Sequence, residues 1–251
     1  MANNSVSLEA PAPRAQANIS RDLEVMGAAD NYYQWMLDEI RPHLGSRVLE
    51  CGSGRGTLTA RLLELRLDRV VASDFDEDYL PGLRAICSGR DSAAVILLDL
   101  EQPAESSIDR LKAEKIDSIV MINVLEHISS DERCLASLAR ALPSGGRIIV
   151  FAPAFPLLFS ALDESYGHYR RYTKRMMRRL AERVGMRTTA MHYVNFPGFF
   201  AWLILYKLFR GTQLGNNSVS IFNRLTPMVR KVESVFRPPL GLSVVTVFEK
   251  R

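Results

Sequence analysis

Short apolar runs alternate with helix-like segments over roughly a hundred residues, and this alternation limits the possible folds more than any other feature. The runs lie within residues 47–51, 69–75, 93–100, 116–128 and 143–154. Between the first two, residues 57–67 place leucines at helical spacing. Continuous apolar runs, as opposed to in-out patterns, are typical of a parallel sheet that helices cover on both faces. The sequence therefore predicts an α/β fold with a doubly wound, mostly parallel sheet.

The flanking segments predict further elements around this sheet. Residues 30–45 have apolar side chains at near-helical spacing, and residues 129–132, Ser-Ser-Asp-Glu, offer a capping box for the helix that follows them. After residue 156 the chain continues with a polar, basic loop and a helix whose apolar face includes Met177 and Leu180. Strands are predicted at 187–194 and 241–250, with an amphipathic helix at 226–236 between them.

Length and composition favour one large domain. The chain has 251 residues, and its 47% hydrophobic content can fill a core of that size. We expect a flexible leader at 1–20 and a single domain at 21–251, with a cofactor half at 21–155 and an acceptor half at 156–251. The leader lacks the pattern of a signal peptide, so we expect a cytoplasmic protein. The three cysteines lie far apart in the sequence, which predicts reduced thiols and neither a disulfide nor a zinc site. The net charge of +4 does not by itself predict nucleic-acid binding.

Residues 194–209 form the most apolar segment, with no charge before Lys207. The segment is shorter than the roughly 20 residues of a spanning helix and contains Pro197 and Gly198, so we do not expect a transmembrane helix. The remaining interpretations are a buried or homodimer-forming helix, a lid over an apolar substrate, and a contact with a membrane surface.

The glycines of "VLECGSGRGT" at 48–57 follow the first strand, where a cofactor loop is expected. A loop for nucleoside triphosphates needs a lysine after its last glycine, and Gly56 is followed by Thr57. A dinucleotide loop needs G-x-G-x-x-G, whereas this loop has G-x-G-x-G at Gly52, Gly54 and Gly56. The spacing therefore excludes a nucleoside triphosphate and weakens the case for a dinucleotide.

Carboxylates lie beside the loop and at the ends of the next two strands. Glu50 precedes the glycines, Asp74 ends the second strand, and Asp99 ends the third. A carboxylate placed like Asp74 can accept hydrogen bonds from both ribose hydroxyls. Three acids next to a pyrophosphate would repel it, whereas a nucleoside with positive charge would be attracted. S-adenosylmethionine, with its ammonium and sulfonium groups, fits this set.

The chain resembles the class I S-adenosylmethionine-dependent methyltransferases through "VLECGSGRG", "ASDFD", "LLDLE" and "NVLEHI". The resemblance implies a Rossmann-like sheet of seven strands, the last one antiparallel, with an acceptor-pocket or lid insertion after the fifth. Cys51 and Arg55 depart from the family pattern, and the role of Arg55 stays open. The residues that the resemblance assigns to the cofactor are Glu50, Gly52, Gly54, Gly56, Asp74, Phe75, Asp99, Leu100, Asn123 and Tyr33.

More narrowly, "NYYQW" and "LDESYGHYRRYT" resemble a bacterial branch of small-molecule methyltransferases, in which both segments face the acceptor. Candidates for a general base, if one is needed, are His127, His168 and Tyr169. No two of the four histidines have metal-ligand spacing, so no metal is expected. Arg170 and Arg171, with Tyr166, are predicted to bind an acceptor with an anionic head and an apolar body, such as a prenyl diphosphate, a lipid or an acidic natural-product intermediate. An RNA methyltransferase and a non-catalytic cofactor-binding partner subunit remain as alternatives.

Overall fold

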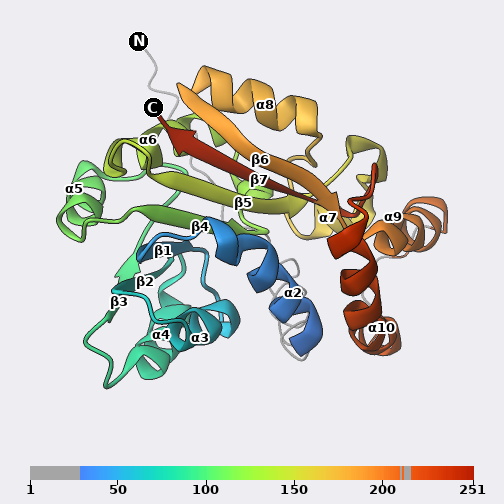
Figure 1. Cartoon of the computed structure of the whole chain (residues 1–251), viewed down its shortest axis with the longest axis horizontal. Coiled ribbons are helices and arrows are strands. Elements are labelled where there is room, and N and C mark those ends of the chain that lie inside the picture. Colours follow the sequence, from blue (N-terminus) through green and yellow to red (C-terminus); the bar gives the residue numbers. More distant parts are fainter. Residues whose placement is uncertain (1–28, 210, 212–215) are drawn as a thin grey trace, which may run out of the picture.

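The computed structural model describes residues 29–209, 211 and 216–251, so the expected leader at 1–20 lies outside the described residues. A seven-stranded sheet in the order β3-β2-β1-β4-β5-β7-β6 forms the centre of the fold (Figure 1). Its strands are β1 (Arg47–Cys51), β2 (Arg69–Asp74), β3 (Ala93–Leu97), β4 (Ser118–Ile122), β5 (Arg147–Pro153), β6 (Met186–Val194) and β7 (Ser243–Lys250). The first five strands are parallel, and β7 pairs antiparallel with both β5 and β6. The predicted doubly wound sheet with an antiparallel last strand is confirmed.

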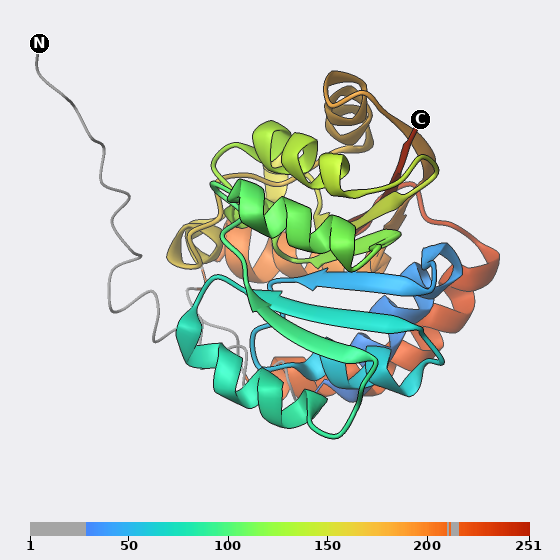
Figure 2. The ribbon, with the colours of Figure 1, turned by 90° about the vertical axis from the view of Figure 1, so that its left-hand side faces the viewer.

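Helices cover both faces of the sheet, as continuous apolar strands require (Figure 2). The helices are α2 (Asp30–Ile40), α3 (Thr57–Glu64), α4 (Leu80–Cys87), α5 (Glu105–Ala113), α6 (Asp131–Ala141), α7 (Ala161–Ser165), α8 (Lys174–Arg183), α9 (Phe196–Trp202) and α10 (Asn216–Val235). The apolar sides of α5, α6 and α8 belong to one buried cluster. Those of α2, α3 and α4 belong to clusters on the other face, where α10 packs against α2.

The helices predicted from leucine periodicity are confirmed, but the predicted capping box at 129–132 is wrong. Helix α6 begins after Ser130, whose side chain caps no N–H group. The side chain and main-chain N–H of Ser129 donate instead to the Glu101 carboxylate, at 2.7 and 2.6 Å. A capping box does form further along the chain, where Ser160 and Asp163 begin α7.

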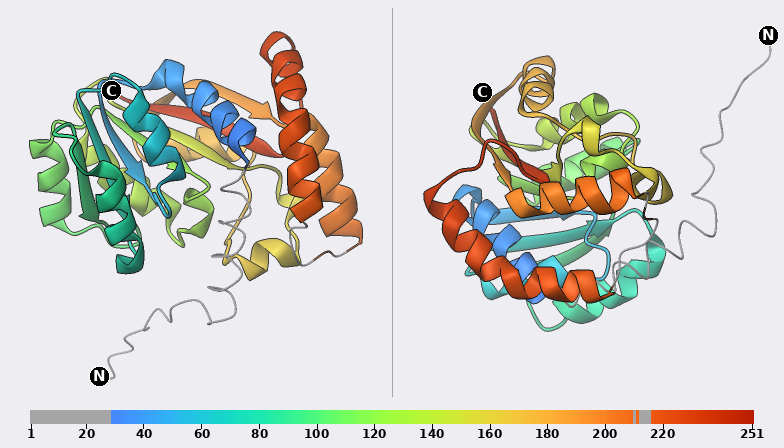
Figure 3. Two further views of the ribbon diagram at one scale, coloured as in Figure 1. Left: turned by 90° about the horizontal axis from the view of Figure 1, so that it is seen from below. Right: turned by 90° about the vertical axis from the view of Figure 1, so that its right-hand side faces the viewer.

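The apolar segment at 194–209 folds into α9 and a following π-helical stretch, η5 (Leu203–Leu208). Only part of it is buried: Phe199 and Tyr206 pack inward, while other large side chains are exposed, namely Phe196, Phe200, Ile204, Leu205, Leu208 and Phe209. Figure 3 shows α9 and α10 at one edge of the molecule. Among the described residues, no helix is both long and apolar enough to cross a membrane.

Glu39 fastens α2 to the last strands of the sheet. It is 9% exposed and accepts hydrogen bonds from Trp35 Nε1 at 3.1 Å and from Arg237 Nη1 at 2.8 Å. Its Oε2 also lies 2.6 Å from Nε2 of His192 on β6. Burial by itself raises the pKa of Glu39, but the contacts with His192 and Arg237 outweigh burial and hold that pKa below its usual range. The ionised carboxylate therefore stabilises the folded chain.

We expect Glu39→Gln to lower the free energy of unfolding at pH 7 by about 2 kcal/mol, because two charged contacts are lost. A depressed pKa gives stability that is present above the unfolded-state value of roughly 4.3 and is lost as the pH falls through the folded-state value. The difference between the two proteins should therefore shrink below pH 4 in urea titrations. The exposed Glu132→Gln serves as the control, and a difference that does not vary with pH would contradict this role.

Candidate functional site

A pocket opens at the carboxyl ends of β1 and β4, beside the first turn of α2. It is lined by Tyr32, Tyr33, Met36, Glu50, Cys51, Gly52, Ser53, Gly54, Arg55, Thr57, Leu58, Ile122 and Asn123. Parallel α/β sheets bind ligands at this edge, outside the carboxyl ends of their strands. The pocket includes five of the residues predicted to bind a cofactor, which are Tyr33, Glu50, Gly52, Gly54 and Asn123.

The loop between β1 and α3 requires glycine at positions 52 and 56, because each has left-handed backbone and a neighbouring side chain close to where a Cβ would lie. Gly52 has φ +66°, and a Cβ there would lie 2.6 Å from Cγ2 of Val124. Gly56 has φ +78°, and a Cβ there would lie 2.4 Å from Cδ1 of Ile86. Left-handed backbone is costly for other residues, and the neighbouring side chains leave no room. The glycines thus let the loop turn tightly between the strand and the helix.

Asp74 holds this loop from the end of β2. Its Oδ2 accepts the Gly54 N–H at 2.7 Å, and its Oδ1 accepts the Asp76 N–H at 3.1 Å. The carboxylate is 5% exposed, and burial raises its pKa while the hydrogen bonds from the main chain act against that rise. The loop and the strand-end acid form one connected unit, although the two are separated in sequence.

Glu50 lines the pocket and is 3% exposed. Thr59 Oγ1 donates to its Oε2 at 2.5 Å. Burial raises the pKa of Glu50 to about 7, so the carboxyl is partly protonated at neutral pH. The carboxyl also raises the pKa of the Tyr33 hydroxyl, an effect second to burial, which indicates that the two groups are close. A cation placed here would favour the ionised carboxylate.

The other predicted cofactor residues lie outside the pocket lining. Phe75 is 68% exposed beyond β2, and Asp99 is exposed, with its Oδ1 accepting the Glu101 N–H at 2.8 Å. The side chain of Leu100 is buried in the core, so only its main chain could reach a ligand. Gly56 begins α3 instead of lining the pocket.

Sequence reasoning missed several lining residues, notably Tyr32, Met36 and Thr57. Tyr32 and Met36 project from α2. The segment "NYYQW" was expected to face the acceptor, but only Tyr33 of this helix was named as a site residue. Arg55, whose role was left open, lines the pocket as well.

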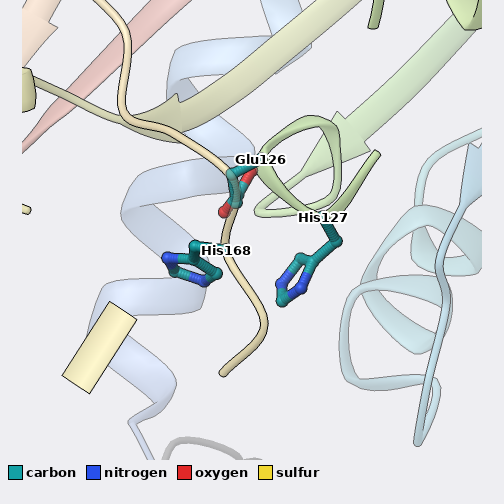
Figure 4. Close-up of side chains that lie close together, drawn as sticks. All are labelled: Glu126, His127 and His168. Atoms are coloured by element: carbon teal, nitrogen blue, oxygen red, sulfur yellow. The ribbon is translucent and has the colours of Figure 1, made fainter. Parts of the chain in front are cut away.

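Two of the predicted general bases, His127 and His168, lie close together (Figure 4). His127 ends the short helix η3 (Leu125–His127), and its ring centroid is 4.6 Å from that of His168. The Nδ1 of His168 lies 2.9 Å from Oδ1 of Asp163. Tyr169 is 53% exposed, and Tyr166 packs near His168 with ring centroids 5.7 Å apart. Burial lowers the pKa of His127 to about 3, so its ring is neutral at physiological pH.

The predicted acceptor-binding arginines differ from the expectation, because both are engaged within the chain. Arg171 is 1% exposed and its Nε and Nη2 donate to Asp163 at 2.8 and 3.1 Å. Its guanidinium also stacks 4.4 Å from the ring centre of Trp202. Arg170 pairs with Asp131 at 2.9 Å and donates to the Ser129 carbonyl at 2.6 Å. These contacts hold both guanidinium groups against the fold, and of the two only the Arg170 side chain, 26% exposed, keeps access to solvent.

Comparison with known proteins agrees with this architecture. Residues 49–150 match the family model of a methyltransferase domain. The chain is 27% identical over 157 residues to the ubiquinone/menaquinone biosynthesis C-methyltransferase UbiE of Yersinia enterocolitica, an alignment that covers 62% of this chain and 61% of the relative. The match therefore spans less than two thirds of that relative's length.

Two solved structures share the fold over most of its length. An S-adenosylmethionine-dependent methyltransferase of Thermotoga maritima is 16% identical and has a TM-score of 0.60, with 94% of this chain and 96% of that chain covered. A chain from the Haloferax volcanii complex of the Trm112 methyltransferase activator with a methyltransferase is 12% identical at a TM-score of 0.62, with the same coverage. At these identities the similarity concerns the fold alone.

The strand order, the loop after β1 and the family match at residues 49–150 indicate an α/β fold similar to a methyltransferase domain. The chain is thus similar to S-adenosylmethionine-dependent methyltransferases in its motifs, in the segment that the family model matches and in its fold.

Proposed function

We propose that the protein transfers a methyl group from S-adenosylmethionine to a small acceptor with an apolar body, in the cytoplasm. The observation that carries this proposal is the pairing of two buried acids, Glu50 and Asp74, with the glycine loop between them at the edge of the pocket. Asp74 fits a ribose diol, because its carboxylate is already held in place by main-chain N–H groups. Glu50 fits the cationic amino-acid end of the cofactor.

S-adenosylmethionine, when bound, supplies a methyl group that forms a bond to the acceptor as its bond to sulfur breaks, and S-adenosylhomocysteine leaves. The residues of this chain would position the reactants and exclude water. Tyr32, Met36 and Ile122 give the pocket its apolar wall. His127 and His168 are our candidates for handling any proton that the acceptor loses, and both lie on segments next to β4.

An acceptor with an apolar body is supported by the exposed side chains of α9, η5 and α10. Phe200, Leu208 and Met228 are among the large apolar groups that remain open to solvent there. The UbiE relatives, named for the biosynthesis of ubiquinone and menaquinone, give the same support. A membrane surface or a second copy of the chain would also cover these side chains. We do not propose an anionic head, because Arg170 and Arg171 are engaged within the fold.

An RNA acceptor is a second candidate, supported by one observation. Helix α8 exposes Arg175, Arg178, Arg179 and Arg183 on one side, while its apolar side packs on the sheet. Such a basic face can bind phosphates without sequence preference. RNA retention that disappears as the salt concentration rises would favour this candidate over a small-molecule acceptor.

Calorimetry with S-adenosylhomocysteine tests the proposed cofactor. We expect one molecule to bind per chain, and we expect Asp74→Ala to weaken binding on the order of 100-fold, because two hydrogen bonds to a charged group are worth about this much. The exposed neighbour Asp78→Ala is the control and should bind as the unmodified protein does. Thermal melting checks that Asp74→Ala stays folded. Tight binding of NADH in place of S-adenosylhomocysteine would contradict the proposal.

A further inference from the structure

We propose that Glu126, His127 and His168 form a binding site for a divalent transition-metal ion. One carboxylate oxygen and one ring nitrogen from each histidine all lie within 4.8 Å of one another, the one such group among the described residues. Figure 4 shows Glu126 and His127 on the turn that follows β4, with His168 on the segment opposite. Because 40 residues separate His127 from His168 in the chain, the sequence did not indicate this arrangement, and no metal was expected.

The Glu126 carboxylate points to a missing ligand. The residue is fully buried, and neither of its oxygens has a hydrogen-bond partner in the structure. Buried carboxylates are normally paired or bound to a metal, because burying an unpaired charge is costly. A bound dication would satisfy both oxygens and hold the group ionised.

The two histidines are prepared to act as ligands through their free nitrogens. Asp163 Oδ1 lies 2.9 Å from Nδ1 of His168, and Asp163 is ionised by its pair with Arg171, so it accepts the Nδ1 proton. That hydrogen bond leaves Nε2 of His168 with a lone pair, the carboxylate-histidine arrangement that commonly supports metal ligands. A main-chain hydrogen bond with Tyr166 orients the ring of His127.

The fold holds the three ligands together from two segments. The Tyr169 N–H donates to the Glu126 carbonyl at 2.8 Å, and this bond fixes the loop of His168 against the turn of Glu126 and His127. The loop is tied down further by the buried pair of Asp163 and Arg171. Both histidines are partly exposed, which leaves a path for an ion to enter and for a further ligand to bind.

Two imidazoles and one carboxylate favour a first-row transition metal such as Zn²⁺ over Mg²⁺ or Ca²⁺, which prefer oxygen ligands. Ligand atoms around tetrahedral Zn²⁺, with bonds of roughly 2.0 Å, lie roughly 3.3 Å apart. Small side-chain rotations would therefore contract the present cluster on binding. Three protein ligands leave at least one position open, as in catalytic sites and unlike closed structural ones.

The open position gives the site a role in the proposed function, on which this step rests. Asn123 lines the cofactor pocket and lies three residues before Glu126 on the turn that follows β4, so the metal would lie beside that pocket. A hydroxyl or enol oxygen bound to a dication loses its proton more readily. The site would thus orient an oxygen-bearing acceptor and favour its deprotonated form, with His127 and His168 acting as metal ligands in place of proton acceptors.

The test is a titration of the full chain with Zn²⁺ after removal of metals by a chelator. We expect one ion to bind per chain. Glu126→Gln and His127→Gln should each weaken Zn²⁺ binding by more than roughly 100-fold, because losing a residue that only hydrogen-bonds to a metal ligand typically weakens binding by about 10–100-fold. The control His43→Gln removes a histidine outside the cluster and should bind Zn²⁺ as the unmodified chain does. Failure of the unmodified chain to bind, or equal loss in His43→Gln, would overturn the proposal.

Two additional measurements keep the result decisive. S-adenosylhomocysteine binding, measured on the same samples, separates the two proposals: a chain that binds this ligand and no Zn²⁺ refutes only the metal site. If circular dichroism shows that the variants are unfolded, the nuclear magnetic resonance spectrum of the unmodified chain with bound Co²⁺ tests the site instead. Paramagnetic shifts of two histidine rings, both retained in His43→Gln, would support the site, and the absence of shifted rings would refute it.

Discussion

Asp163→Asn is expected to lower the free energy of unfolding by about 3–5 kcal/mol, the usual effect of breaking a buried ion pair from one side. Asp163 is fully buried and Arg171 is 1% exposed, so the arginine left behind could not reach water. The aspartate also accepts hydrogen bonds from the main-chain N–H and hydroxyl of Ser160, at 2.9 and 3.0 Å. An amide in its place would direct N–H groups at these donors.

Urea unfolding at pH 7 measures this effect, and an exposed ion pair provides the control. Glu105→Gln removes a carboxylate that binds Arg140 through two hydrogen bonds of 2.7 Å, but both side chains are more than half exposed. Exposed pairs contribute little because water replaces the lost partner. Asp163→Asn should therefore lower the free energy of unfolding much more than Glu105→Gln does, although each variant breaks a bidentate ion pair. Similar losses in both would mean that Asp163 does not hold the loop through a buried charge.

The sheet was predictable from sequence because its inner strands β1, β2, β4, β5 and β7 are buried on both faces. The apolar runs of β1 to β5 are continuous, and their separation by helical segments leaves few alternatives to a parallel sheet. The glycine loop and Asp74 were predictable for a related reason: strand ends of one sheet meet at one edge, so the sequence order fixed their proximity.

Contacts made by loops were not predictable in the same way. Arg170 and Arg171 lie in a strongly basic stretch. The neighbouring sequence does not indicate that the guanidinium of Arg171 is buried in an ion pair with Asp163, eight residues earlier. His127 and His168 come from different loops, and only folding brings their rings within 4.6 Å. The positive charge of this loop therefore predicted an acceptor-binding surface, whereas Arg171 forms a buried ion pair with Asp163. The long sequence separation of His127 and His168 gave no sign that their rings lie together.

Gly56→Ala is expected to destabilise the protein by about 2–5 kcal/mol. Left-handed backbone at φ +78° costs a residue with a Cβ about 1–2 kcal/mol. The new Cβ would also lie 2.4 Å from Cδ1 of Ile86 and 3.1 Å from Cδ2 of Leu83, and overpacking of this kind costs about 1–3 kcal/mol. Urea unfolding of the purified variant measures the sum.

Two further variants separate the backbone cost from the overlap. Gly89 has nearly the same φ, +73°, with nothing within 4 Å of an added Cβ, so Gly89→Ala should show the backbone cost alone. Ile86→Val removes the overlapping Cδ1, and in the double variant it should recover part of the stability lost in Gly56→Ala. Equal losses in Gly56→Ala and Gly89→Ala, with no recovery from Ile86→Val, would contradict the overlap. A positive result would show that this glycine is needed where the loop packs on α4, since it does not line the pocket.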